Sequence, residues 1–315
     1  MNGLKRCVKK EIKFSNFSWI NISNPNEGEI QKLAERHKFH PLDLQECLKS
    51  TQRTKIDAYH DYIFLITLFP IYNRQTRAIE SGEIDFFISR KYLITIHRDN
   101  FLPLNDFFHV LEIHSEFRNK FSDFSPEPLL YEILNKLFLY CFPMIDHLIL
   151  DCDDIEKAIF SDKMEKMISE ILLLRRNITD FRKLMQVHKN VLKKLIQNLK
   201  DNPLYVMKKT DVYFESLVEY DKELWDTLDN LKERIEALQE TNESQISFKL
   251  SHIMKILTII SVITFPITLI AAIFGMNTLR TMPFVDHPFG FWIVIAFMLS
   301  IASGMLIIFK KNKWF

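Results

Sequence analysis

Glycine is scarce in this sequence, with only six residues in 315. Phosphate-binding loops of the GxxxxGK and GxGxxG types need several closely spaced glycines, because their backbone must approach the phosphate closely. The glycines here are too widely separated for either motif: Gly3, Gly28, Gly82, Gly275, Gly290 and Gly304. We therefore expect neither a nucleotide nor an organic cofactor.

Cysteine and net charge are low as well. The four cysteines form no CxxC pair and no zinc-ligand spacing, so we expect reduced or buried thiols. A net charge of +1 provides no electrostatic field for nucleic acid. The basic segment Met1 to Lys13 has no apolar core after it, so no cleavable signal peptide is expected. The sequence shows no pairing of a nucleophile with a general base, so we do not expect an enzyme.

Two long apolar runs stand out near the end of the chain. Ile256 to Phe274 contains 19 residues without a charge, and Phe291 to Phe309 follows it closely. Each is long enough to cross a bilayer as a helix. The connection, Gly275 to Gly290, has 16 residues. This is enough only for a tight hairpin, so both ends of the pair are expected on the same side.

The flanking charges predict which side that is. Lys249 and Lys255 precede the first run, whereas Arg280 is the only basic residue of the connection apart from His287. A basic tail follows the second run: Lys310, Lys311 and Lys313. By the positive-inside rule we expect a multi-pass protein of the plasma membrane (the inner membrane of a bacterium or archaeon) with both termini in the cytoplasm.

Small and hydroxyl residues form a stripe along the first apolar run. At 100° per residue the stripe occupies an arc of about 80°. We call it the hydroxyl stripe; its members are Met254, Leu257, Ser261, Thr264, Thr268, Ala272 and Gly275. Two interpretations are open: packing between helices, or the wall of a water-filled pore. A pore would require several copies of the helix around one axis.

The motifs in and around this run resemble those of the CorA family of magnesium and cobalt transport proteins. The resemblance begins with Gly275-Met276-Asn277, the GMN motif, and with Met282-Pro283 in the connection. It covers nearly the whole chain, through further matches at Leu257-Thr258-Ile259-Ile260, Phe265-Pro266, His40-Pro41-Leu42, Gln52-Arg53 with Lys55, Tyr213-Phe214 and the lysines before Trp314.

The resemblance implies a homopentamer with a cytoplasmic funnel, in which the first membrane helices surround a central cation pore. It implies a selectivity filter at Gly275, Met276 and Asn277, and a hydrophobic gate at Leu257 and Met254. The pore-lining residues it implies are Thr268, Thr264, Ser261, Ala272 and Phe265.

The remaining sequence predicts an α+β fold. Phe17 to Ile22, Lys55 to Tyr72, Ser81 to Ser89 and Tyr92 to His97 are expected as strands, and Glu27 to Arg36 and Pro41 to Leu48 as short helices. Long helices are expected over Glu127 to about Phe160 and over Lys163 to Asp201, ended by Asn202-Pro203. We expect these divisions: an α/β domain (1–125), paired helices (126–202), a stalk helix (203–255), membrane helices (256–274 and 291–309), an outer loop (275–290) and a basic tail (310–315).

The stalk combines an apolar seam with acidic residues. The seam recurs at steps of three and four, as in helix packing: Leu217, Tyr220, Leu224, Leu228, Leu231, Ile235 and Leu238. Ten acidic residues between Glu215 and Glu243 stand against three basic ones. These carboxylates either pair with the basic helix before the stalk or line a funnel that collects divalent cations. With no break before Gly275 apart from Pro266, one helix of roughly 64 residues is expected.

Three positions depart from the family pattern. Phe284 stands where the loop usually has a glutamate, and Phe274 where a tyrosine is usual before the GMN motif. Ser216 replaces an aspartate of the site through which cytosolic Mg²⁺ closes the family's channels. Glu215 and Glu219 are the candidates to take over this regulatory metal site.

The function implied is uptake of divalent cations, Mg²⁺ first and also Co²⁺ or Ni²⁺. Two charges crossing 100 mV gain about 4.6 kcal/mol, so the membrane potential alone is a sufficient driving force. Two alternatives are open: a zinc transporter of the same superfamily, and a membrane-anchored coiled-coil scaffold that conducts nothing.

Overall fold

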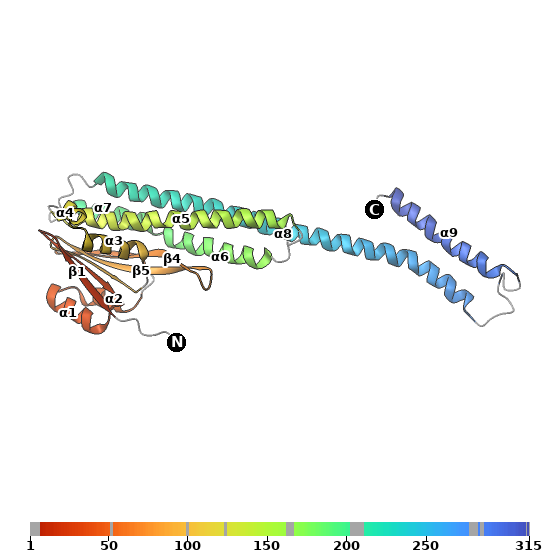
Figure 1. Ribbon diagram of the computed structural model, residues 1–315, viewed down its shortest axis with the longest axis horizontal. Helices are drawn as coiled ribbons and strands as arrows, with labels where there is room; N and C mark the ends of the chain where they lie inside the picture. Colours follow the sequence, from red (N-terminus) through yellow and green to blue (C-terminus); the bar gives the residue numbers. More distant parts are fainter. Residues whose placement is uncertain are drawn as a thin grey trace. The chain divides into compact units, whose positions relative to one another are not determined.

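The computed structural model describes residues 7–50, 53–98, 101–122, 125–161, 167–201, 211–276, 283, 287–312 and 314 (Figure 1). The chain divides into two compact units, Met1–Gln239 and Glu240–Phe315. The boundary falls within helix α8, Asp211–Phe274. Each unit is described separately.

A six-stranded mixed sheet organises the first unit. Its strands are β1 (Val8–Lys13), β2 (Ser18–Ser23), β3 (Lys55–Ala58), β4 (Ile63–Asn73), β5 (Ala78–Ser89) and β6 (Tyr92–His97). Their order is β1-β2-β6-β5-β4-β3, and only β2 and β6 pair in parallel. The first eight residues of β4 are all buried, since helices cover both faces of the sheet.

One face of the sheet is covered by α1 (Glu27–His37) and α2 (Pro41–Leu48), as Figure 1 shows. Local signals set the ends of these helices. The Asn26 side chain accepts a hydrogen bond from the Glu29 backbone N–H, and Pro41 occupies the first turn of α2. Lys38 closes α1 with a φ of 51°. The apolar residues of these helices pack on Ile22, Ile66 and Ile96 of the sheet.

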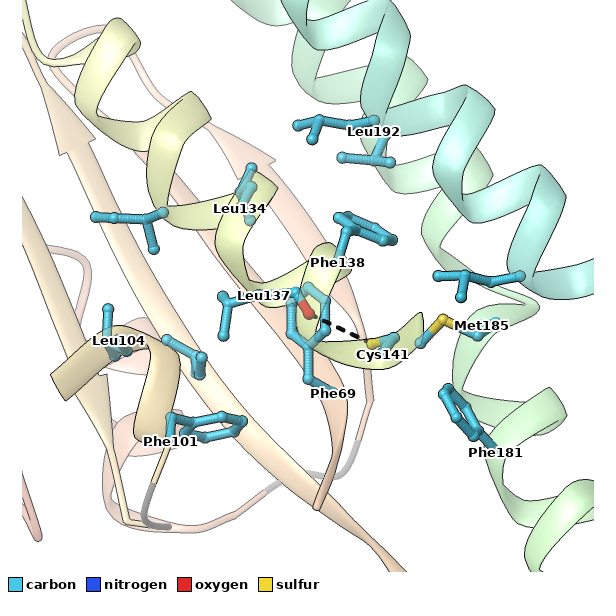
Figure 2. Close-up of a cluster of buried hydrophobic side chains, with 14 of the residues drawn as sticks. Phe69, Phe101, Leu104, Leu134, Leu137, Phe138, Cys141, Phe181, Met185 and Leu192 are labelled. Carbon is cyan, nitrogen blue, oxygen red and sulfur yellow. Dashed lines mark hydrogen bonds between the residues drawn. The ribbon is translucent and has the colours of Figure 1, made fainter. Parts of the chain in front are cut away.

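The other face of the sheet forms the main core with the remaining helices of this unit. They are α3 (Leu102–Ile113), α4 (Ser115–Ser122), α5 (Glu127–Ile159), α6 (Met167–Met185), α7 (His188–Asp201) and the first part of α8. Figure 2 shows Phe69 of β4 among Leu134 and Phe138 of α5, with Phe181 of α6 close by. The Cys141 thiol in this cluster donates to the Leu137 carbonyl at 3.4 Å.

The predicted apolar seam of α8 is confirmed. All its members are buried in the main core except Tyr220, which packs against it. Because α5, α7 and α8 lie side by side (Figure 1), the seam anchors the first part of α8 to the rest of the unit.

The prediction of one helix over Lys163 to Asp201 is wrong. The chain instead forms α6 and α7, with a break at Gln186 and Val187, while Lys163, Asn202 and Pro203 lie outside the described residues. The break has a tertiary cause. The buried ring of His188 packs on Phe69 and Phe138, and its Nδ1 lies 2.9 Å from the Leu184 carbonyl oxygen. In an unbroken helix the Leu184 carbonyl would accept a hydrogen bond only from a backbone N–H, so a side chain that inserts here disturbs the helix.

Four further differences concern the first unit. The single strand predicted over Lys55 to Tyr72 is two strands, β3 and β4, joined by a turn in which the Tyr59 N–H donates to the Tyr62 carbonyl at 2.8 Å. Strand β1 and helices α3 and α4 were not predicted. Strand β1 and helix α4 are short and polar, and such segments carry little periodic signal. Helix α3 is longer and buries Leu104, Phe107, Phe108 and Leu111, so its apolar spacing was available in the sequence.

The second unit contains the end of α8 and helix α9 (Gly290–Lys311). Both are long and apolar enough to cross a membrane, each with a mean hydropathy of 2.5 in its most apolar window. Helix α8 continues through Pro266 without ending. Helix α5 is also long and apolar enough, with a mean hydropathy of 1.4 in its most apolar window, but its apolar residues fill the main core.

Candidate functional site

Helix α8 ends in a tightened turn at the GMN motif. The Gly275 N–H donates to the Ala271 carbonyl at 2.9 Å, and the Met276 N–H donates to the Ile273 carbonyl at 3.2 Å. A Cβ atom at Gly275 would lie 3.2 Å from the Ala271 carbonyl oxygen, a close approach that favours glycine. Asn277, the third residue of the predicted filter, lies outside the described residues, as do Arg280, Met282 and Phe284.

The hydroxyl stripe is largely exposed in one copy of the chain, as is most of the apolar part of α8. Thr264, Thr268 and Ala272 are exposed and Ser261 is half-buried. The predicted gate residues Met254 and Leu257 are 63% and 60% exposed, and Phe265 reaches 75%. Within one copy, these side chains are left available to water or to another copy.

Each hydroxyl of α8 near the stripe donates its hydrogen to the carbonyl four residues earlier. The four bonds are Thr258 to Met254 (2.8 Å), Ser261 to Leu257 (2.9 Å), Thr264 to Ile260 (2.7 Å) and Thr268 to Thr264 (2.9 Å). With their hydrogens engaged in this way, the oxygens offer lone pairs only. The stripe therefore presents a row of hydrogen-bond acceptors.

A cavity of about 590 Å³ shows which side of α8 faces α9. Ala271 and Phe274 of α8 line it together with Phe291 and Val294 of α9, and His287 contributes from the connection. At 100° per residue, Ala271 and Phe274 lie 60° and 120° around the helix from Thr268. Gly275, the last member of the stripe, also lines the cavity, whereas Ser261, Thr264 and Thr268 do not. Packing around this cavity therefore does not account for the three hydroxyls.

The candidate regulatory residues lie at the start of α8. Glu215 and Glu219 are both exposed, and the Ser216 hydroxyl donates to the Tyr213 carbonyl at 2.7 Å. Among the described residues of one copy, no group of three His, Cys, Asp or Glu side chains could hold a metal ion. A metal at Glu215 and Glu219 would need ligands from elsewhere, such as a neighbouring copy.

Two other stalk acids pair with helix α6. The Arg182 guanidinium lies 2.7 Å from the Asp229 carboxylate, and Arg175 lies 3.5 Å from Glu236. These contacts fit the interpretation in which the basic helix before the stalk pairs with its carboxylates. Exposed members of the acidic set such as Glu219 and Glu223 lie outside these pairs.

A polar group that the sequence analysis did not single out lies at the break between α6 and α7. Asp221 of α8 is 3% exposed, and its carboxyl accepts a hydrogen bond from the Lys189 backbone N–H in the first turn of α7. Burial raises the pKa of Asp221 to about 7, opposed by the Lys189 ammonium. Burial also lowers the pKa of His188 to about 4. The sequence signal that could have identified Asp221 is its spacing: it lies four residues after Leu217 and three before Leu224, which puts it on the buried seam of α8.

The end of α9 carries the basic tail. Lys310 and Lys311 lie in its last turn, and the Trp314 ring stacks on Phe309 with 5.4 Å between ring centroids. Lys313 lies outside the described residues. Lysine and tryptophan at the end of an apolar helix are typical of a membrane interface.

Comparisons with known proteins agree with the resemblance. A family model described as "CorA-like Mg2+ transporter protein" matches residues 14–311. The cobalt/magnesium transport protein CorA of Thermotoga maritima is 27% identical over 301 residues, covering 94% of this chain and 83% of the relative. The putative metal ion transporter YfjQ of Bacillus subtilis is 24% identical, covering 94% and 89%.

Solved structures show the same fold. The CorA magnesium transporter from Methanocaldococcus jannaschii superposes with a TM-score of 0.81 at 25% identity, covering 97% of this chain and 94% of that one. The full-length CmaX protein gives a TM-score of 0.73 at 16% identity, covering 95% and 89%. The predicted α+β fold with two C-terminal apolar helices is confirmed.

Proposed function

This chain belongs to the family of CorA-like Mg²⁺ transporter proteins, and from that premise we propose that it conducts divalent cations, Mg²⁺ above all, through a pore formed by identical copies. The observation that carries the proposal is the hydroxyl stripe: a row of acceptor oxygens along one side of an otherwise apolar helix. The names of the relatives also support Co²⁺ as a substrate.

The chemistry of a hydrated cation fits such a wall. Mg²⁺ gives up its water reluctantly, so a fast pore must carry the ion with much of its water shell. Water molecules bound to a cation turn their oxygens inward and their hydrogens outward. A wall that accepts hydrogen bonds stabilises this shell, whereas the shell of an anion would need donors. The oxygens of Ser261, Thr264 and Thr268 offer acceptors only.

An acceptor row in contact with lipid would gain nothing, because acyl chains have no hydrogen-bond donors. Since Ser261, Thr264 and Thr268 do not line the cavity between α8 and α9, they need other copies of α8 around a water-filled axis. We propose a homopentamer, the number that the family resemblance implies. In this assembly Gly275, Met276 and Asn277 form the filter, and Met254 and Leu257 form a gate that closes by excluding water.

The membrane potential supplies the energy, and the proposal involves no nucleotide, organic cofactor or enzymatic step. Helices α8 and α9 cross the bilayer as a hairpin, with both termini in the cytoplasm and the lysines of the basic tail at the inner surface. A regulatory Mg²⁺ between copies, held by Glu215 and Glu219, is part of the proposal.

The test is ion flux into liposomes that contain the purified protein, with an inside-negative potential and Mg²⁺, Co²⁺, Ni²⁺ or Zn²⁺ outside. Asn277→Ala removes the amide of the filter and should lower Mg²⁺ flux at least tenfold, since about 1.4 kcal/mol of lost ion stabilisation suffices. Asn230→Ala, at an exposed stalk position, is the matched control and should keep full flux.

Three results would contradict the proposal. Unchanged flux in Asn277→Ala would remove that residue from the filter. Absence of flux in the unaltered protein would favour a scaffold. A native mass measurement showing a monomer would exclude any shared pore.

A further inference from the structure

A carboxyl group lies inside the apolar layer between the sheet and α2. Asp85 of β5 pairs with Ile66 of β4 and with Ile96 of β6, and Ile22 continues the same row in β2. These isoleucines are at most 1% exposed and belong to the cluster under α1 and α2. Because residues in one cross-strand row point to the same face, Asp85 belongs to this layer. It is 3% exposed.

Helix α2 closes over this carboxyl. The Cys47 thiol of α2, itself 3% exposed, interacts with the Asp85 carboxyl. Among the described residues, the Oδ1 atom of Asp85 has no hydrogen-bond partner. An ionised carboxylate left in this way would be costly, whereas a protonated carboxyl is tolerated in an apolar layer.

The charged groups around Asp85 do not neutralise it. Glu83 of β5 and Glu46 of α2 add negative charge, and Asp43 of α2 also acts on the neighbouring thiol. Lys55 of β3, in the same cross-strand row, is paired with Glu46 and Asp57 at 2.7 Å each. The cation that acts on Asp85 is Arg98, just after β6, whose guanidinium donates to the Cys47 and Leu48 carbonyls at the end of α2. Burial above all, together with the two glutamates, raises the pKa of Asp85 to about 8 against the opposing effects of Cys47 and Arg98.

We propose that Asp85 is a proton-operated latch: the protonated carboxyl lets α2 close on the sheet, and loss of the proton loosens α2. The direction follows from linkage. The closed state binds the proton more tightly than an open state in which Asp85 has an ordinary pKa, so opening becomes more favourable as pH rises through the interval between the two values. Above the pKa of the closed state the effect levels off.

The test is hydrogen exchange of the full-length protein in lipid nanodiscs at pH 6 and pH 8. Protection of the α2 amides, corrected for the intrinsic exchange rate at each pH, should fall roughly 50-fold between these two values, the change that the two pKa values give. Asp85→Asn, which is neutral at both pH values, should change less than about threefold on the same scale. Asp106→Asn, at an exposed position of α3, is the matched control and should behave like the unaltered protein.

Two outcomes would overturn the proposal: equal protection of α2 at both pH values in the unaltered protein, or the same loss of protection in Asp85→Asn. Should Asp85→Asn fail to fold, infrared spectra of the unaltered protein labelled with ¹³C-aspartate give an independent test. Because Asp221, with a pKa of about 7, would also give a protonated band at pH 6, the spectra are compared with those of Asp221→Asn. A protonated carboxyl band that persists in Asp221→Asn at pH 6 and is lost at pH 10 supports the latch, and its absence from Asp221→Asn at pH 6 overturns it.

Discussion

Thr264→Val separates the two interpretations of the hydroxyl stripe. The substitution keeps the shape of the side chain and removes the hydroxyl, whose hydrogen goes to the Ile260 carbonyl at 2.7 Å. That carbonyl keeps its backbone partner in the helix, so no polar group loses its only partner. The free energy of unfolding should therefore change by no more than about 0.5 kcal/mol.

The effect on conduction should be much larger. Each copy loses one acceptor for the water shell of the ion, and a neutral hydrogen bond contributes about 0.5 to 1.5 kcal/mol. If the hydrated ion contacts two such hydroxyls at once, the barrier rises by about 1 to 3 kcal/mol. That corresponds to a flux about 5- to 150-fold lower.

Mg²⁺ flux into liposomes under a fixed potential is the measurement, with the oligomer checked by native mass. Thr258→Val is the matched control, because Thr258 makes the same bond to Met254 at 2.8 Å but lies about 120° around the helix from Thr264. Full flux in Thr264→Val, or an equal loss in both variants of an intact assembly, would refute the acceptor argument.

Two further predictions concern the first unit. Asn177→Leu should lower the free energy of unfolding by about 2 to 4 kcal/mol in denaturant titrations. The Asn177 amide accepts a hydrogen bond from the Ile79 N–H at 3.1 Å and donates one to the Arg77 carbonyl at 2.8 Å, and the substitution removes both. An equal loss in Asn190→Leu, at an exposed position of α7, would contradict this. His188→Phe should gain stability relative to the unaltered protein as pH falls from 6.5 to 4, because the folded unaltered chain holds His188 neutral with its pKa lowered to about 4 and so binds fewer protons there than the unfolded chain. His37, whose pKa burial also lowers to about 4, acts in the same direction as His188, whereas Asp85 and Asp221, with raised pKa values, act in the opposite direction, so the difference between the two proteins is the test. Identical pH dependence of stability in both proteins would exclude the assignment.

Local signals explain which elements could be predicted. Helix α2 and strand β6 have the bounds expected from Pro41 and from the alternation after Tyr92. The single helix from Asp211 to Phe274 follows from a long periodic stretch without glycine. The split between β3 and β4 was missed, because its turn at Tyr59–Tyr62 contains neither glycine nor proline.

Features that depend on tertiary contacts could not be predicted. The break between α6 and α7 depends on the His188 ring packing on Phe69 and Phe138, residues far away in sequence. The burial of Asp85 depends on the docking of α2 over β5. The hydroxyl stripe could be identified because all its members lie on one helix, where spacing alone gives the angle around the axis. The assignments of Gly275, Met276 and Asn277 to the filter and of Met254 and Leu257 to the gate stay predictions, and so do the domain divisions.

The contact between Asp221 and the start of α7 limits how α8 can slide along its neighbours. A seam of leucines repeats, so a shift by one helical turn, about 5.4 Å, would still match apolar side chains. Asp221 does not repeat, and the same shift would take its carboxyl away from the Lys189 N–H and into an apolar environment. Leaving a buried polar group without its hydrogen bond in this way costs about 1 to 3 kcal/mol. Asp221 thus fixes the position of α8 along its own axis relative to α7. A conformational change transmitted along α8 would therefore have to tilt or bend the helix rather than slide it.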